Sequence, residues 1–363
     1  MIYKKKGVIE LQFNWIFILI AGAIIFVFFI NIVNKQREFS EVKTSGTIIT
    51  NLESILTGAQ ISTDTVNIID MPKVDIGFEC NRYFIGPVPK QTKNSVIFAP
   101  NLLKGKQLIT WALDWNMPYR ITNFLYITDP QIRYVIVYDE DTEEVANKIF
   151  DKLPKEMNKE KFNMDDPLQE FKDKNNYKVK FIFLTDIALS DVDNNGLKDL
   201  KRMPDEDVTA IKIIFGASTV IPSTGTINFL QKDGDVWVSR TDTFYLKEES
   251  LFGAIFAADL EMYNCVMKKA FTKLNLLSKI YVERSSKLSD FYGIDNHLCA
   301  SAHSKAVNHL EIMRDTSEER TKNFPDGIQI SNINDMLRNS NQIGGTQESA
   351  NYQAQLFSCA LIY

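Results

Sequence analysis

The sequence predicts an α+β or α/β ectodomain, with a mixed sheet and a helical C-terminal region, carried on a single N-terminal transmembrane helix. Three observations lead to this fold class. Every residue from Trp15 to Ile30 is apolar or glycine. Apolar strand-like runs alternate with helical patterns in the middle of the chain, and strand signals vanish after Leu251. We therefore divide the chain into an N-terminal tail and anchor (1–34), a helical stalk (35–60), an α/β core (61–250) and a helical C-terminal region (251–363).

The anchor is expected to contact the lipid bilayer through residues 11–33, Leu11 to Val33. This stretch is about 34 Å long as a helix, which is enough to cross a hydrocarbon core of about 30 Å. A removable signal peptide has a shorter apolar region and a small-residue cleavage site, and no Ala-x-Ala follows this one. Lys4, Lys5 and Lys6 precede the span, so we expect a cytoplasmic N-terminus and an extracytoplasmic C-terminal domain in the cell membrane.

The residues before the anchor carry a more specific pattern. Lys6-Gly7-Val8-Ile9 and the apolar run after it resemble the class III signal peptide of archaeal type IV pilin-like, membrane-anchored surface proteins. The remainder resembles uncharacterised membrane-anchored proteins of archaea. The resemblance implies cleavage between Gly7 and Val8, retention of the apolar helix and surface or pilus-like assembly partners. Glu10 departs from it, because it stands three residues after the implied cut instead of five. A plain signal anchor is the alternative.

The next elements follow from local periodicity. Ile48, Leu52 and Leu56 recur at helical spacing and predict a helix over residues 42–59, with no proline between it and the anchor. Residues 65–126 are expected to be mostly strands, with a short helix at Leu108–Trp115. The expected strands here are Val66–Ile69, Val74–Phe78 and Val96–Phe98.

Residues 131–240 have the pattern of strands covered on both faces. The expected strands are Tyr134–Tyr138, Val179–Leu184 and Ile211–Phe215, with a helix at Glu143–Leu153. A hairpin of residues 225–230 and 235–238 is expected to turn at Lys232-Asp233-Gly234. Further along, helices are expected over residues 255–284, 297–314, 328–340 and 347–357.

One acidic loop resembles a calcium-binding loop. Asp191, Asp193, Asn195 and Asp199 are spaced as oxygen ligands, and Gly196 stands where such loops turn tightly. The twelfth position is Arg202 instead of glutamate. The alternative is a solvated turn, for which these residue types are the commonest. Ca²⁺ is thus the one cofactor the sequence suggests.

A second set of acids follows the predicted strands. Asp139 and Asp141 come after one strand and Asp186 after the next. Ligands of open α/β sheets bind beyond the carboxyl ends of strands, where carboxylates could hold Mg²⁺ for hydrolysis. The favoured alternative is that Asp141 or Thr142 caps the helix that follows.

Other constellations are weaker. His297, His303 and His309 recur every six residues, do not share a helix face, and are expected on helix surfaces. Cys299 and His303 do share a face, but two ligands are too few for zinc. The chain has no Gly-x-Ser-x-Gly, His-Glu-x-x-His, dinucleotide-binding or P-loop motif.

The four cysteines, Cys80, Cys265, Cys299 and Cys359, all follow the anchor, and we expect them to form disulfides; buried free thiols are the alternative. If the helices at 255–284 and 297–314 form an antiparallel hairpin, Cys265 lies about 30 Å from the connection and Cys299 beside it, which excludes this pair. Two pairings remain. Cys80–Cys265 with Cys299–Cys359 is favoured over Cys80–Cys299 with Cys265–Cys359.

These observations favour an anchored protein with a structural or binding role at the cell surface, and they assign no catalytic residue. The alternative is an anchored extracytoplasmic hydrolase that uses a metal and the strand-end acids. The 41 basic and 46 acidic residues give a net charge of −5, so nucleic acid is not an expected partner.

Overall fold

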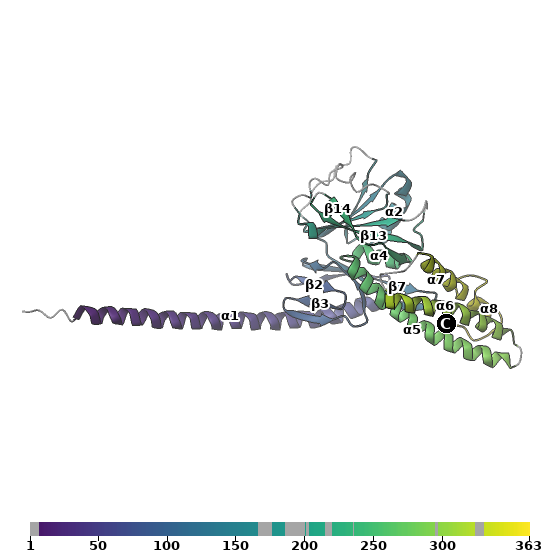
Figure 1. The fold of residues 1–363 in the computed structure, drawn as a ribbon, viewed down its shortest axis with the longest axis horizontal. Coiled ribbons are helices and arrows are strands. Elements are labelled where there is room, and N and C mark those ends of the chain that lie inside the picture. The colour runs from purple at the N-terminus through teal and green to yellow at the C-terminus, as the bar shows by residue number, and fades with distance from the viewer. Residues whose placement is uncertain are drawn as a thin grey trace, which may run out of the picture.

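The N-terminal half of the longest helix projects from the rest of the protein. The computed structural model describes residues 7–165, 176–185, 200, 203–214, 220–234, 236–294, 297–323 and 330–363. Helix α1 runs without interruption over Gly7–Ile61, so the predicted anchor and stalk form one element. Figure 1 shows it leaving the body as a straight rod. Its last turns belong to the core, because Ile49, Leu52 and Leu56 are buried at helical spacing.

The first sheet packs against the end of α1. Its strand order is β1-β7-β8-β5, with β5 parallel to β8 and the other pairs antiparallel. The four strands are β1 (Val66–Asp70), β7 (Gln107–Asn116), β8 (Arg120–Thr128) and β5 (Val96–Phe98). The expected helix at Leu108–Trp115 is wrong, since these residues lie in β7. They are apolar on both faces and Leu108–Ala112 are all buried, a pattern that periodicity cannot distinguish from a buried helix.

A smaller sheet of short antiparallel strands lies beside α1, in the order β4-β3-β2-β6. These strands are β2 (Ile76–Glu79), β3 (Arg82–Ile85), β4 (Val88–Gln91) and β6 (Leu102–Leu103). Glu53 of α1 and Lys90 of β4 form an ion pair of 2.6 Å across this contact.

The largest sheet is mixed, as the sequence predicts, with the order β10-β9-β11-β12-β13-β14 and with β15 also pairing β13. Its first four strands are parallel, and β13 is antiparallel to β12. All residues of β9 and β11 are buried, because both faces of the sheet are covered. The strands are β9 (Ile132–Tyr138), β10 (Asn158–Asn163), β11 (Lys178–Phe183), β12 (Val208–Ile214), β13 (Thr224–Asp233), β14 (Val236–Ser239) and β15 (Thr243–Leu246).

Turns and short helices connect these strands. Gly234, with a φ of 61°, turns the β13–β14 hairpin at the expected place. The short helices are η1 (Glu140–Thr142), α2 (Glu143–Lys152) and η3 (Asp205–Asp207). Helix α4 (Glu248–Phe256) contacts both the first sheet and β15, and Ser250–Phe256 are all buried. A helix that is buried all round belongs to the core.

The C-terminal region is helical, as predicted, but its first helix is divided. The expected helix over 255–284 is split by residues 257–259 into α4 and α5 (Leu260–Gly293). Asp259 causes the new start, since its carboxylate accepts the Met262 N–H at 2.7 Å as an N-cap. The later helices are α6 (Leu298–Asn323), α7 (Ile330–Ile343) and α8 (Ala350–Leu356).

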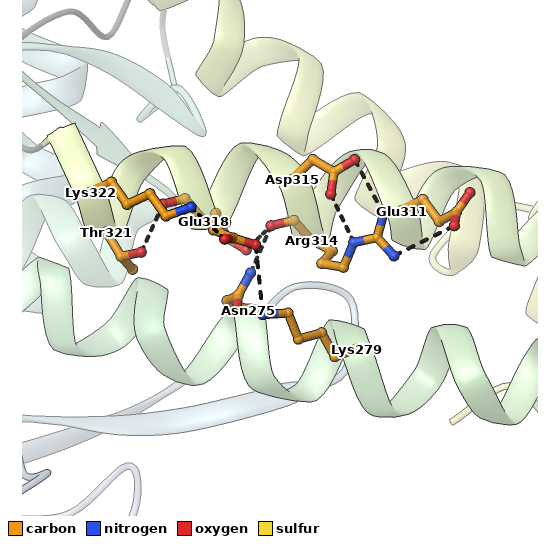
Figure 2. Close-up of polar contacts among 9 residues, drawn as sticks. Asn275, Lys279, Glu311, Arg314, Asp315, Glu318, Thr321 and Lys322 are labelled. Carbon is orange, nitrogen blue, oxygen red and sulfur yellow. Dashed lines mark hydrogen bonds and ion pairs between the residues drawn. The ribbon is translucent and has the colours of Figure 1, made fainter.

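Helices α5 and α6 form a long hairpin that extends from the body away from the exposed part of α1 (Figure 1). Polar contacts bridge the two helices, as Figure 2 shows: the Asn275 side chain donates to the Arg314 carbonyl at 2.8 Å, and Lys279 pairs with Glu318 at 3.6 Å. Because these groups are partly exposed, each pair adds little stability. Their geometry nevertheless sets the register between the helices.

Candidate functional site

The carboxyl ends of the parallel strands in the largest sheet form the first candidate site. The chain passes from β9 to β10 on one side and then to β11 on the other, so the strand order reverses beside β9. Crevices at such reversals are the usual ligand sites of open α/β sheets. Asp139 and Asp141 follow β9 at this edge. Asp186, which the sequence places after β11, lies outside the described residues.

The Asp139 carboxylate is held by local hydrogen bonds. Its Oδ1 accepts the backbone N–H of Thr142 at 3.0 Å and the Thr142 hydroxyl at 2.7 Å, and the hydroxyl in turn accepts the Asp139 N–H at 3.1 Å. This is a capping box at the start of η1. Asp139 thus caps η1. Thr142 stands at the N-cap of α2, one of the two positions that the sequence predicts, but its side chain makes no capping bond to that helix.

Asp165 also reaches this edge, and the sequence analysis missed it. It follows β10, and its Oδ2 accepts the Glu140 N–H at 3.0 Å. Strand β10 reads Asn-Lys-Glu-Lys-Phe-Asn, which is too polar for an apolar-run search, although such a composition suits an edge strand. The edge thus gathers several carboxylates, of which those of Asp139 and Asp165 are engaged by the turn between β9 and α2.

The predicted calcium ligands Asp191, Asp193, Asn195 and Asp199 lie outside the described residues. Calcium binding by this loop therefore stays a prediction from the sequence.

A small charged cavity lies at the opposite end of the same sheet, beside the start of α5. Its volume is about 140 Å³, and its lining includes Lys178, Arg240, Glu206 and Asp259. Burial lowers the pKa of Lys178, while the nearby Asp207 carboxylate opposes the shift. The ammonium of Lys178 donates to the side chain of Asn101. The cavity therefore carries both charge signs and could hold a small polar molecule.

Lys180, two residues further along β11, is buried below this cavity and does not line it. Burial lowers its pKa to about 7, against the opposing effect of Asp259. Its ammonium donates to the carbonyls of Ala254 and Ala257 at the C-terminal end of α4. A lysine in this position satisfies the last carbonyls of a helix, so its unusual pKa reflects a structural contact.

The cysteines form the first of the two pairings that the sequence left open. Cys80 and Cys265 are bonded with a Cα separation of 5.9 Å, and Cys299 and Cys359 with 5.6 Å. The first bond joins the β2–β3 turn to α5. The second joins the start of α6 to the segment that follows α8.

The histidines do not all lie on helix surfaces as expected. His297 precedes α6 and is exposed, but His303 is fully buried, with its ring stacked on Tyr292 at a centroid distance of 5.7 Å. Burial lowers the pKa of His303 more than the adjacent Ala360 backbone raises it. His309 is half-buried, and its Nδ1 lies 2.8 Å from Oδ1 of Asn339.

Comparison with known proteins gives no relative. No protein-family model, curated protein sequence or solved structure matches this chain.

Proposed function

We propose that this chain is a membrane-anchored extracytoplasmic protein with a structural or binding role at the cell surface. The observation that carries the proposal is the continuous helix α1, which is an exposed apolar rod at one end and a core element at the other. Residues Trp15–Gln36 have a mean hydropathy of 3.0 over the most apolar window, and none of that window is buried. Water solvates such a surface poorly, whereas a bilayer accommodates it.

The geometry of α1 supports a head held close to the membrane. The apolar segment of 22 residues is about 33 Å long. Among the stalk residues whose burial is described, Ser45 is the first that is buried against the body, about 13 Å beyond Gln36 along the helix. The head therefore stands just above the headgroup region, and the rigid stalk limits its motion relative to the anchor.

Membrane fractionation of the full chain tests the anchor. We expect the wild type in the membrane fraction, resistant to alkaline carbonate. The variant Ile24→Arg/Phe28→Arg should shift toward the soluble fraction, because central charges oppose insertion. Leu276→Arg/Ile280→Arg is a matched control, since these residues are also exposed, apolar and four apart on a helix but lie on α5. Wild type in the soluble fraction without detergent would contradict the proposal.

The proposed orientation has the N-terminus in the cytoplasm and the head outside. Protease added to intact cells should digest an epitope tag placed after Tyr363. Protection of this tag until the cells are permeabilised would overturn the orientation while leaving the anchor itself intact.

Within this role, we propose that the chain is pilin-like. Two tests separate this from a plain anchor. First, mass spectrometry of the mature N-terminus should show Val8 as the first residue, because a plain anchor keeps Met1. Second, the rotation of the head about α1 should matter. A two-residue insertion between residues 40 and 44 turns the head by about 200° about the helix axis. A seven-residue insertion turns it by almost two full turns, so that the head faces within about 20° of its original direction. Head-to-head crosslinks should survive only the seven-residue insertion in an assembly with packed anchors.

A metal-assisted hydrolase is the second candidate, favoured by the parallel strand order that brings the β9 and β10 ends together. Mg²⁺-dependent hydrolysis of a chromogenic phosphate ester by the purified chain would support it. Asp141→Asn should then abolish turnover, while Asp151→Asn, exposed further along α2, should not. No turnover by the wild type removes this candidate.

We also propose weak Ca²⁺ binding by Asp191, Asp193, Asn195 and Asp199. The support is the ligand spacing in the sequence. A calcium titration followed by calorimetry should show binding that Asp191→Ala/Asp193→Ala removes. An unchanged titration would leave a solvated turn.

A further inference from the structure

Three metal-ligand side chains meet where the C-terminal segment crosses the start of α6. His297, Cys299 and Cys359 each offer one ligand atom, and these atoms all lie within 4.8 Å of one another. Among the described residues, this is the one group of three or more such side chains at that spacing. In the structure the two sulfur atoms are bonded to each other. They become available as ligands only when the disulfide is reduced.

The surroundings of this cluster place the third ligand beside the sulfur atoms. Cys299 is the second residue of α6, and His297 directly precedes this helix. The His297 Nδ1 accepts the Cys299 N–H at 3.2 Å, which holds the imidazole beside the sulfur atoms. The Tyr292 ring contacts two imidazoles, at centroid distances of 5.8 Å to His297 and 5.7 Å to His303.

His303 lies beside this cluster without belonging to it. It lies one helical turn after Cys299 and is fully buried, but it is not one of the three side chains whose ligand atoms lie within 4.8 Å of one another. Its ring is stacked on Tyr292 and lies next to the Ala360 backbone. His303 therefore packs the C-terminal segment against α6, close to Cys359.

We propose that Cys299 and Cys359 exchange a disulfide for a Zn²⁺ site when the chain is reduced, with His297 as third ligand. A dithiol reductant supplies two electrons and two protons, the S–S bond becomes two thiols, and the reductant becomes a disulfide. Binding of Zn²⁺ then releases the two thiol protons. Two thiolates and one imidazole fill three positions of a tetrahedral zinc ion and leave the fourth to water.

Other contacts keep the cluster together after the disulfide opens. Ile362 is fully buried, and its N–H donates to the Asn351 side chain at 2.8 Å. Arg284 of α5 donates to the Ile362 carbonyl at 3.3 Å, and the Ala360 N–H donates to the Tyr292 hydroxyl at 3.1 Å. The segment that carries Cys359 therefore stays on the hairpin, and the two thiols stay close enough to share an ion.

The second disulfide is an internal control. Near Cys80 and Cys265 the structure places Lys269, whose ammonium donates to the Cys80 carbonyl. No histidine belongs to that pair among the described residues. A lysine ammonium repels a cation, so reduction of this disulfide should not create a metal site.

The test uses the full chain in detergent, reduced with a phosphine, with Zn²⁺ or Co²⁺ as the probe. We expect the reduced chain to bind one ion and, with Co²⁺, to show a thiolate-to-metal charge-transfer band. The oxidised chain should bind no ion and show no such band. Zn²⁺ should protect Cys299 and Cys359, but not Cys80 and Cys265, from alkylation as mapped by mass spectrometry.

Variants locate the site. Cys80→Ser/Cys265→Ser should keep full binding, and His297→Gln should weaken it at least about tenfold. His297→Gln leaves all four cysteines in place, so the oxidised variant can form both disulfides. Its folding can therefore be checked independently of metal binding. The proposal is overturned if the reduced wild type binds no ion, or if Zn²⁺ protects all four cysteines equally.

Discussion

Replacing Gly253 by alanine should destabilise the protein, although alanine is the better helix former. Gly253 lies in the interior of α4, which is buried between the sheets. A Cβ atom built at this position would meet three ring atoms of Phe98 at 2.7–2.9 Å. Carbon atoms do not approach this closely, so either the ring or the helix would have to move.

Two opposing effects decide the magnitude. Alanine in a helix interior gains about 1 kcal/mol over glycine. Overpacking of a core costs about 1–3 kcal/mol, and Phe98 has little freedom to yield. Its ring is fully buried and packs against the rings of Phe124, Tyr126 and Tyr263 at centroid distances of 5.4, 5.9 and 5.9 Å. The overpacking cost should therefore lie in the upper half of this range, about 2–3 kcal/mol. After subtraction of the helix gain, we expect Gly253→Ala to lower the free energy of unfolding by about 1–2 kcal/mol.

Urea unfolding of the full chain in detergent, followed by tryptophan fluorescence, measures this change. Gly58→Ala is the control, because Gly58 is an exposed residue of α1 with no atom within 4 Å of the added Cβ. This variant should be stabilised by up to about 1 kcal/mol. In a Phe98→Leu background, where the ring is absent, Gly253→Ala should be close to neutral. The reasoning is refuted if Gly253→Ala stabilises the protein as much as Gly58→Ala does.

Three further predictions concern charge, covalent and apolar contacts. Burial lowers the pKa of Lys180 to about 7, so above that pH the unfolded chain binds more protons than the folded chain. The free energy of unfolding should therefore rise by about 2 kcal/mol from pH 7 to 9. Lys180→Met should remove this rise in urea titrations. The variant Cys80→Ser/Cys265→Ser removes a disulfide between residues separated by 185 positions. The chain-entropy model predicts that the free energy of unfolding falls by about 5 kcal/mol, and a fall below about 1 kcal/mol in urea unfolding would contradict it. Leu52→Ala should cost about 3 kcal/mol and speed hydrogen exchange in the stalk, whereas the half-exposed Ile55→Ala should cost under about 1 kcal/mol.

The elements that the sequence predicted correctly are those whose signals are local. The apolar run and the spacing of Ile48, Leu52 and Leu56 are enough to define α1. Strands β9 and β11 appear as apolar runs because both of their faces are buried. The β13–β14 turn is found because glycine accepts the positive φ that the turn requires.

The elements that the sequence missed depend on distant partners. Strand β7 is apolar on both faces only because α4 and α1 lie near its sheet, so its sequence alone also fits a buried helix. The break between α4 and α5 depends on Asp259, whose capping bond competes with continuation of the helix. Strand β10 is polar, and its pairing with β9 supplies the stability that its own side chains do not.

The candidate site was predicted less well than the fold, for a related reason. The sequence found Asp139 beside a strand end, but not that its carboxylate is engaged by Thr142. The six-residue spacing of the histidines places them on different faces of a helix. Which of these faces is buried depends on the C-terminal segment that covers His303. The cysteine pairing was within reach because a helical hairpin constrains distances along its length.

The two disulfides fasten parts of the fold that are built from short elements. The sheet β4-β3-β2-β6 has strands of two to four residues, and so short a sheet is marginal alone. Cys80 ties its central turn to α5, and Lys269, one helical turn after Cys265, donates to the carbonyl of Cys80. The same helix face thus supplies a covalent and a polar contact to this sheet.

The C-terminal segment is in the same position. It follows the seven-residue helix α8, which cannot be stable by itself, and Cys359 ties it to the start of α6. Strands β9 and β11, by contrast, are buried along their whole length and have no covalent bridge. Reduction should therefore loosen the small sheet before it affects the largest sheet, because its short strands depend on the covalent bond. The C-terminal segment should stay in place, since Ile362 is fully buried and its N–H is bonded to the Asn351 side chain.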